Sequence, residues 1–420
     1  MHDTASEPRD VAPTRHLRRR LTSTTMFRRE LAAALPDRPF ELAFWDGSVL
    51  HATRPGGPRL SVRSPAAVSQ LLFAPGQIGL GRAYVAGLLD VDDLDLVMPL
   101  LRGWGPPAPD ARGRLRLAAA ALRAAGPYPP PRPPAAEMPP DGLRHSLVRD
   151  RRAVRHHYDV SNDFFALFLD ESMTYSCAIF SRGASTLEDA QRTKLELVCS
   201  KLALQPGQRL LDVGCGWGAL ALHAAREHGV DVLAITLAAE QAALARRRVR
   251  DAGLADRIEI RVADYRELAQ TGFDAVSSVG MVEHVGAEQM DVYARQLAAF
   301  LKPGGRLLNH GIALLRSDDP PAGPFSERYV FPDAHPVPLS GVLASLERAN
   351  LVTESVEGFA ADYAETLRHW STRLDANLAE ATRLAGAARV RIWRLYLRAA
   401  RNGFESGTTS IYQVRARKPG

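Results

Sequence analysis

A glycine-rich turn after a short apolar run is the part of the sequence best suited to chemistry. Residues 209–213 end in Asp212 and Val213, and glycines then stand at positions 214, 216 and 218, before a helical pattern. Glycine lets a backbone approach a ligand closely, and a helix N-terminus offers unpaired N–H groups. The spacing G-x-G-x-G differs from the G-x-G-x-x-G of dinucleotide-binding turns. The turn predicts a small-molecule site at a strand end, with a nucleotide-fold turn for another ligand as the alternative.

The acidic residue before the glycines makes this unit resemble class I S-adenosylmethionine (SAM) methyltransferases. In that class the acidic strand end, here Asp212, and the glycine loop hold the methionine part of SAM. A carboxylate often ends the second strand and binds the ribose, but here Thr236 and Gln241 stand in that region and can replace it. The third strand candidate ends at Asp264 and Tyr265, where the adenine ring of such enzymes lies.

Further segments resemble one family, the cyclopropane-fatty-acid synthases, which include the mycolic acid cyclopropane synthases. They cover about 145–420 in order: RHHYDVSNDFF (155–165), MTYSCA (173–178), VEHVG (282–286), LNHGI (308–312), RYVFP (328–332) and ADYAETL (361–367). The segment GRAYVAG (81–87) is similar to the accessory domain of longer family members. The loops 316–321 and 331–336 depart from the family pattern, which leaves the length of the substrate chain open.

The resemblance implies transfer of a methylene group from SAM to a cis double bond of an unsaturated phospholipid acyl chain, which forms a cyclopropane. Methyl transfer leaves a carbocation in the chain, and loss of a proton from the new methyl closes the ring. That step requires a base and a dry site, and the family is understood to hold a bicarbonate ion as the base. Because the cation is shared, a fatty-acid methyltransferase that makes a methyl or methylene branch is the alternative function.

The family motifs carry over to two groups of site residues. One is a bicarbonate cage, in which two members would act through their backbones and Tyr363 would offer a phenolic donor and an aromatic face to the cation: Cys177, Glu283, His310, Ile312 and Tyr363. The other is a set of SAM contacts: Tyr175, Ser176, Asp212, Gly214, Gly216, Gly218, Thr236, Gln241, Tyr265 and Arg266.

Several of these residues also have a purely structural interpretation. Cys177 can be a small buried hydrophobic residue, and Tyr363 lies in a helical pattern that suits a core position. His310 is favoured as a site residue because α/β sheets bind ligands at the C-terminal ends of their strands, whereas we assign His284 a structural role.

No metal is expected from the sequence. His156, His157 and Asp159 lack a second cluster at ligand spacing. The three cysteines, at positions 177, 199 and 215, form neither a disulfide framework nor a zinc pattern.

Strand and helix patterns alternate in the second half of the chain, which predicts an α/β fold with a mostly parallel sheet and right-handed crossovers. The strand candidates are 209–213, 230–237, 257–263, 273–279 and 305–313, with helices at 217–228 and 239–252. Two later strands, 351–358 and 409–417, are expected to form an antiparallel edge. Together with the resemblance, this predicts a doubly wound, seven-stranded methyltransferase sheet with an added helical lid and a smaller N-terminal accessory domain.

Composition divides the chain into four parts: a disordered tail (1–15), an accessory domain associated with lipid or dimer contacts (16–125), a proline-rich linker (126–144) and the methyltransferase domain (145–420). The linker is too rich in proline for a helix or a central strand. In the accessory domain, strands are expected at 40–45 and 59–62 and helices at 66–73 and 78–86. The basic stretch at 17–29 is either a helix that lies on a membrane surface or a solvated helix face.

The charge and composition of the chain limit the classes of partner that it is expected to bind. Only four of the 53 basic residues are lysines, and the net charge is +6; guanidinium groups suit the phosphates of lipids and of nucleic acids. No nucleic-acid-binding module is recognisable, no apolar run approaches the ~20 residues of a membrane span, and no signal-peptide core is present. Sparse cysteines favour a reducing compartment.

We therefore expect a cytoplasmic protein at the inner face of the membrane, with an unsaturated phospholipid and not a nucleic acid as its partner. A nucleic-acid methyltransferase is the more distant alternative. We also expect a homodimer, and a reductase as a partner if the product is a methylene branch.

Overall fold

The structure is a computed structural model that describes residues 24–126, 131–138, 146, 149–150, 152, 161–316, 323–332 and 336–420, apart from the side chains at 101 and 102. The chain divides into two units between Ala135 and Ala136. The predicted tail (1–15), most of the predicted linker, the basic positions 18–20 and the segment with His156, His157 and Asp159 lie outside the described residues.

The first unit is built around a four-stranded sheet in the order β2-β1-β3-β4. Alternate residues of β1 are buried, Leu42 and Phe44 among them, so that one face of the sheet packs on helices. Strand β1 pairs antiparallel with β2 and parallel with β3, and β4 pairs antiparallel with β3. The elements are α2 (Thr25–Ala34), β1 (Glu41–Phe44), β2 (Val49–Leu50), β3 (Arg59–Val62), α3 (Pro65–Phe73), α4 (Gln77–Val85), β4 (Leu89–Val91), α5 (Leu94–Gly103) and α6 (Ala111–Ala125).

The second unit holds a seven-stranded sheet in the order β10-β11-β9-β8-β5-β6-β7. Five strands run parallel, and β11 pairs antiparallel with both β9 and β10, which confirms the predicted fold class. The strands are β5 (Arg209–Val213), β6 (Asp231–Thr236), β7 (Ile258–Val262), β8 (Phe273–Val279), β9 (Leu301–Leu314), β10 (Val352–Gly358) and β11 (Thr409–Arg417).

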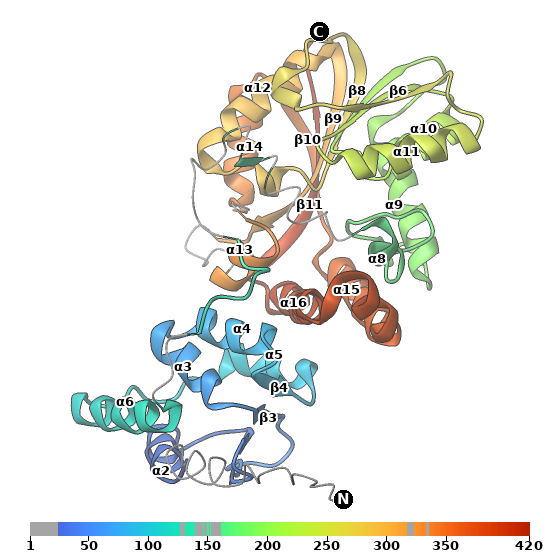
Figure 1. Ribbon diagram of the computed structural model, residues 1–420. Coiled ribbons are helices and arrows are strands. Elements are labelled where there is room, and N and C mark those ends of the chain that lie inside the picture. The colour runs from blue at the N-terminus through green and yellow to red at the C-terminus, as the bar shows by residue number, and fades with distance from the viewer. Residues whose placement is uncertain are drawn as a thin grey trace, which may run out of the picture. The chain divides into compact units, whose positions relative to one another are not determined.

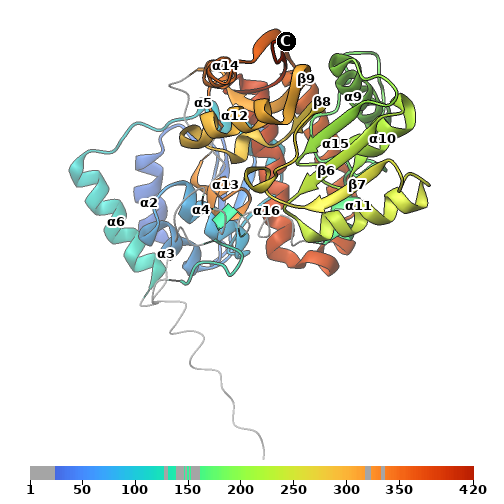
Figure 2. The same ribbon diagram turned by 90° about the horizontal axis from the view of Figure 1, so that it is seen from above.

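Helices cover both faces of this sheet, as Figure 1 shows. Successive residues of β5 point to opposite faces: Leu210 packs with one group of helices and Leu211 with the other. The first group is α9 (Leu187–Leu202), α10 (Ala219–His228) and α11 (Ala239–Asp251), and the second is α12 (Met290–Phe300) and α14 (Leu339–Arg348). The view from above separates the same two groups (Figure 2).

An aromatic cluster joins two long helices to the end of the sheet where β5 meets the glycine turn. Trp370 of α15 (Ala360–Ala376) and Trp393 of α16 (Leu378–Ser406) are buried there against α8 (Asn162–Ala166) and the glycine-turn residue Trp217. The remaining short elements are α13 (Pro324–Tyr329), η1 (Tyr265–Glu267), η2 (Val282–His284) and η3 (Ala287–Gln289). The cluster places an apolar enclosure at the predicted ligand edge.

The predicted element bounds differ from the structure mainly at glycines. The helix expected at 217–228 begins at Ala219, because Gly218 has a φ of +81° and caps it. The strand expected at 305–313 begins four residues earlier, because Leu301 already pairs with Phe273 and an irregularity between Phe273 and Ala275 absorbs the proline–glycine segment. None of the helices in the described part of the chain has the length and apolar composition that crossing a membrane requires.

Candidate active site

A pocket opens at the C-terminal ends of β5, β6 and β7, around the glycine turn. Nine of the ten predicted SAM contacts line it: Tyr175, Ser176, Asp212, Gly214, Gly216, Thr236, Gln241, Tyr265 and Arg266. Gly218 does not line it; this glycine is the N-cap of α10. His284, to which we assigned a structural role, also lines the pocket, and its ring packs on Phe331.

The first glycine of the turn has a backbone conformation and a close neighbour that exclude any side chain. Gly214 has a φ of +84°, and a Cβ atom at this position would lie 2.5 Å from Cγ of Met281. Only glycine fits both this backbone conformation and this contact. The backbone at Gly214 and Gly216 itself lines the pocket.

A buried acid and a buried amine face the same pocket. Asp212 accepts a hydrogen bond from Ser277 Oγ (2.8 Å), and burial raises the pKa of its carboxyl to about 6. Lys194 donates to Ser176 Oγ (3.0 Å), and burial lowers the pKa of its amine to about 8. Sequence reasoning missed Lys194; its type was the available signal, since the chain has only four lysines.

The strand ends beyond the turn carry polar groups in fixed positions. Thr236 Oγ1 donates to Gln241 Oε1 (3.0 Å), so the two residues predicted to replace a ribose-binding carboxylate form one unit. Arg266 is held between Asp264 (2.6 Å) and Asp150 (2.8 Å). The Thr236–Gln241 pair and the Arg266 group all line the pocket wall, where such polar groups can fix the orientation of a polar ligand.

The segment that carries Tyr175 and Ser176 is positioned from behind. Gln191 of α9 donates to the backbone oxygens of Thr174 (3.2 Å) and Ser176 (2.8 Å). The ring of Tyr175 stacks on Trp370, with centroids 5.1 Å apart. These contacts place the segment between the pocket and the aromatic cluster.

The five predicted cage residues do not line this pocket, but two of them adjoin it in the chain. Glu283 directly precedes the lining residue His284, and Cys177 directly follows Ser176. Glu283 Oε1 accepts a hydrogen bond from the N–H of Ile312 (2.7 Å), so the backbone of Ile312 acts on the carboxyl group. Burial raises the pKa of Glu283 to about 7. Its Oε2 atom is buried and has no hydrogen-bond partner among the described residues.

His310 presents a second buried atom of this kind. Its Nδ1 lies 3.2 Å from Nε2 of Gln413, which comes from β11. Burial lowers the pKa of His310 to about 3, so the ring is neutral at pH 7. If the amide donates to Nδ1, the ring proton sits on Nε2. Nε2 is buried and lacks a partner among the described residues, which leaves a donor ready for a ligand.

Gly311 brings Glu283 close to β9, the strand that carries His310. A Cβ atom at Gly311 would lie 2.1 Å from Cγ1 of Val282 and 3.6 Å from Oε1 of Glu283. A larger residue would force the η2 segment away from the strand. Gly311 therefore fixes the approach of the carboxyl group.

The other two predicted cage residues are buried in the aromatic cluster. Cys177 Sγ lies within hydrogen-bonding distance of the backbone oxygen of Ala178 (3.2 Å), and burial raises the pKa of its thiol well above the usual value. A thiol in this state is not a nucleophile. Tyr363 packs against Phe404 and Trp370, with ring centroids 4.7 and 6.1 Å away.

The buried carboxyl of Glu283 predicts a pH-dependent stability difference. Its pKa is higher in the folded chain (about 7) than the usual 4.5, so unfolding releases a proton between these values and the unfolding free energy falls as pH rises. Relative to Glu283→Gln, the wild type should lose roughly 2–3 kcal/mol between pH 5 and pH 8. Urea unfolding at both pH values measures this, and a difference that does not change with pH would contradict the buried, protonated state.

Comparisons with known proteins place the chain among lipid-modifying enzymes. The family profile described as mycolic acid cyclopropane synthetase matches residues 145–414. A probable fatty acid methyltransferase of Mycobacterium tuberculosis (strain ATCC 25618 / H37Rv) is 39% identical over 405 residues, which cover 93% of each chain. The cyclopropane-fatty-acyl-phospholipid synthase of Escherichia coli (strain K12) is 34% identical over 81% of this chain and 82% of its own. A solved mycolic acid cyclopropane synthase complexed with SAH and CTAB matches 66% of this chain and all of its own, with a TM-score of 0.61 and 31% identity.

Proposed function

The chain belongs to the mycolic acid cyclopropane synthetase family of SAM-dependent lipid methyltransferases, and from this premise we propose that it converts a cis double bond of an unsaturated phospholipid acyl chain into a cyclopropane. The observation that carries the proposal is a pair of buried atoms, Glu283 Oε2 and His310 Nε2, which have no hydrogen-bond partner among the described residues. Buried polar atoms are normally hydrogen-bonded. Two buried atoms that lack partners are therefore suited to bind a small ion that forms hydrogen bonds with them.

Bicarbonate fits this donor set. Neutral His310 donates through Nε2, and Glu283, with its pKa near 7, can donate when protonated or accept when ionised. When bound, bicarbonate would supply the base that takes the proton of the new methyl group. Glu283 and His310 would hold that base in place, and Gly311 fixes the distance between their supporting segments. Tyr363 would offer its phenolic donor to the ion and its aromatic face to the cation.

The pocket residues would orient the methyl donor. Asp212, held by Ser277, suits the ammonium group of SAM, and the Thr236–Gln241 pair suits the ribose hydroxyls. In the reaction the C–S bond of the sulfonium breaks as a C–C bond to the alkene forms, and the positive charge passes to the acyl chain. Loss of one proton and ring closure then restore neutrality.

A methyl- or methylene-branched product is the second candidate. The relative named a probable fatty acid methyltransferase matches along 93% of both chains, whereas the cyclopropane synthase match covers 81% of this chain. Both products follow from the same cation, and a methylene branch would need a reductase partner to become a saturated methyl branch.

The test is incubation of the full chain with methyl-labelled SAM and vesicles of a defined unsaturated phospholipid, with bicarbonate depleted and restored. We expect label in a cyclopropane acyl chain, identified by mass spectrometry and NMR, and a rate that rises with bicarbonate. A branched product without a ring would replace the cyclopropane by the second candidate. A parallel incubation with RNA should incorporate no label, and incorporation into RNA alone would overturn the lipid substrate.

Access to such a substrate implies contact with a bilayer surface, and helix α6 of the first unit carries a suitable face. Its exposed apolar side chains recur at helical spacing: Leu115, Ala118, Ala119 and Leu122. Leu115 is 72% and Leu122 57% exposed, and exposed arginines at 112, 114, 116 and 123 accompany them. An apolar stripe with flanking guanidinium groups suits an anionic lipid surface. In the described part of the expected basic stretch, Arg28 donates to the backbone of Val49 and Arg29 pairs with Glu30, and Arg116 of α6 pairs with the same Glu30.

Substituting this face should weaken membrane association. Leu115→Glu combined with Leu122→Glu is expected to lower the affinity for anionic phospholipid vesicles by on the order of tenfold per residue, because each change removes a leucine from the lipid interface. Co-sedimentation with vesicles measures this. Leu96→Glu, at an exposed apolar position of α5, is the matched control and should bind as the wild type does. Equal loss in both variants would reject α6 as the contact face.

A further inference from the structure

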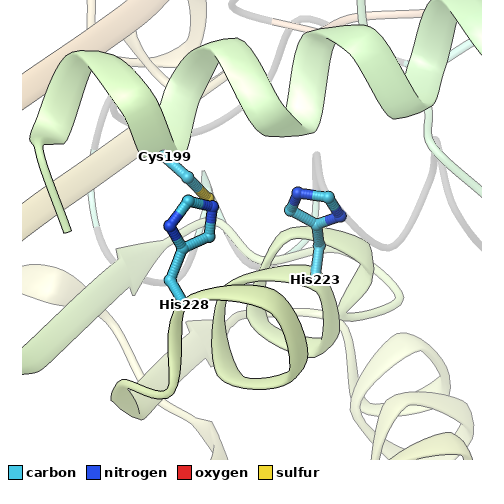
Figure 3. A group of neighbouring side chains, drawn as sticks. All are labelled: Cys199, His223 and His228. Carbon is cyan, nitrogen blue, oxygen red and sulfur yellow. The ribbon is translucent and has the colours of Figure 1, made fainter. Parts of the chain in front are cut away.

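A second group of polar side chains lies between α9 and α10, outside the site described above. Cys199 comes from α9, and His223 and His228 come from α10. Figure 3 shows the cysteine of one helix and the two histidines of the other pointing toward one another. The cysteine is buried and both histidine side chains are mostly buried, with 13% and 18% of their surfaces exposed.

The spacing of the side-chain atoms is close to that of a metal-ion ligand shell. One ligand atom from each of the three residues lies within 4.8 Å of the other two. Tetrahedral zinc with Zn–N bonds of about 2.0 Å and Zn–S bonds of about 2.3 Å requires separations of roughly 3.3–3.6 Å. A side-chain rotation that moves an atom by about an ångström would therefore close the shell.

Glu196 contacts both histidines but is not a member of the three-residue group; its side chain is half exposed, so a rotation toward Cys199 can make it the fourth ligand. Its Oε2 lies 3.1 Å from Nε2 of His223 and 3.1 Å from Nε2 of His228. These distances approach the ~3.3 Å between two N or O ligands of one tetrahedral zinc ion. Glu196 and Cys199 are three residues apart on α9, so both project from the same side of that helix.

We propose that Cys199, His223, His228 and Glu196 bind one divalent transition-metal ion of the zinc type, which ties α9 to α10. The donor set of one thiolate, two imidazoles and one carboxylate is of the kind that zinc binds. Binding displaces the thiol proton of Cys199 to solvent and forms the metal–sulfur bond. Four protein ligands leave no open position, so the site is structural and takes no part in the transfer reaction.

The position of this site gives it a consequence for the cofactor pocket. Leu195 and Val198 of α9 and Ala219 and Leu220 of α10 line that pocket. A metal ion between the same two helices would hold this wall in place. The proposal is independent of the transfer reaction, because no proposed catalytic or SAM-binding residue is a ligand.

Metal content and the absorption spectrum of the cobalt-loaded protein test the proposal. The full chain, dialysed against zinc and then against metal-free buffer, should retain one equivalent, and Co²⁺ loading should give a thiolate-to-cobalt charge-transfer band. Cys199→Ser should abolish the band, and His223→Gln should lower the cobalt affinity about tenfold or more. Cys215→Ser should keep the band, and His51→Gln, which changes an exposed histidine of the first unit, should keep the stoichiometry.

Two results would overturn the metal site. One is a cobalt spectrum without the charge-transfer band in the correctly folded wild type, which would leave a hydrogen-bonded Glu196–histidine cluster. The other is the same metal content in Cys199→Ser, His223→Gln and the wild type. Circular dichroism of each variant separates loss of the metal from loss of the fold.

Discussion

Glu283→Gln is expected to reduce product formation about 10²–10⁴-fold, the usual contribution of a positioned acid–base group. The substitution keeps the size of the side chain, and the amide oxygen can still accept from the N–H of Ile312 (2.7 Å). It then places an amide NH₂ where the buried Oε2 was, and this group cannot ionise or accept a hydrogen bond. The base that Glu283 helps to hold would therefore be lost or misplaced. Turnover of labelled SAM on unsaturated phospholipid vesicles measures the effect.

SAM affinity separates this effect from a general defect. Because Glu283 does not line the cofactor pocket, the dissociation constant of SAM should stay within about threefold of the wild type. Glu288→Gln, which changes an exposed carboxyl a few residues away, should retain full turnover. Turnover within a few-fold of the wild type in Glu283→Gln would remove Glu283 from the proposed mechanism.

Asp212→Asn is expected to weaken SAM binding by about 10–100-fold, because a hydrogen bond to a charged group contributes about 1.5–3 kcal/mol. The asparagine can still accept from Ser277, but it no longer offers a negative charge to the ammonium group of SAM. The wild-type affinity should also fall as pH drops below about 6, the pKa to which burial raises Asp212, because the protonated acid no longer attracts that ammonium group. Calorimetric titration of both proteins from pH 5 to pH 8 measures both effects.

The asparagine variant should not be less stable than the wild type at pH 8. A carboxyl whose pKa is raised by burial destabilises the fold once it ionises, so its removal should maintain or increase the unfolding free energy. Asp251→Asn, at an exposed position of α11, should bind SAM normally. If Asp212→Asn binds SAM as tightly as the wild type at pH 8, Asp212 is not a cofactor contact.

Strand positions in the second unit were predictable because β-branched and apolar runs there are bounded by turns. The ranges 273–279 and 409–417 agree with the structure at both ends. The order of the strands in the sheet was harder to predict, because no local feature of residues 409–417 indicates that this strand lies between β9 and β10. The start of β9 was missed because Pro303 and Gly304 are typical of a turn, whereas Leu301 already pairs with Phe273 and the strand continues through an irregularity to Arg306, which pairs with Ala275.

Site residues that belong to a recognisable motif were predictable from the sequence, whereas residues whose role depends on burial and packing were not. The glycine turn and Asp212 stand together in the sequence, and the family resemblance that they helped to establish is confirmed. Lys194 and Gln413 gave no motif, because their roles come from what packs against them: Ser176 in one case and His310 in the other. The Cys199–His223–His228 group was missed for the same reason, since two helices bring its members together.

The place of β11 in the sheet links completion of folding to activity. This strand inserts between β9 and β10, both of which precede it in the chain, so a chain that has folded only this far presents two unpaired strand edges at an open slot. The same insertion delivers Gln413 to His310. Until the slot is filled, the imidazole of His310 lacks its contact with Gln413, and the exposed strand edges make a partly folded chain prone to aggregation. Insertion of β11 would therefore have to precede the proposed chemistry, because the contact between Gln413 and His310 exists only once this strand is in place.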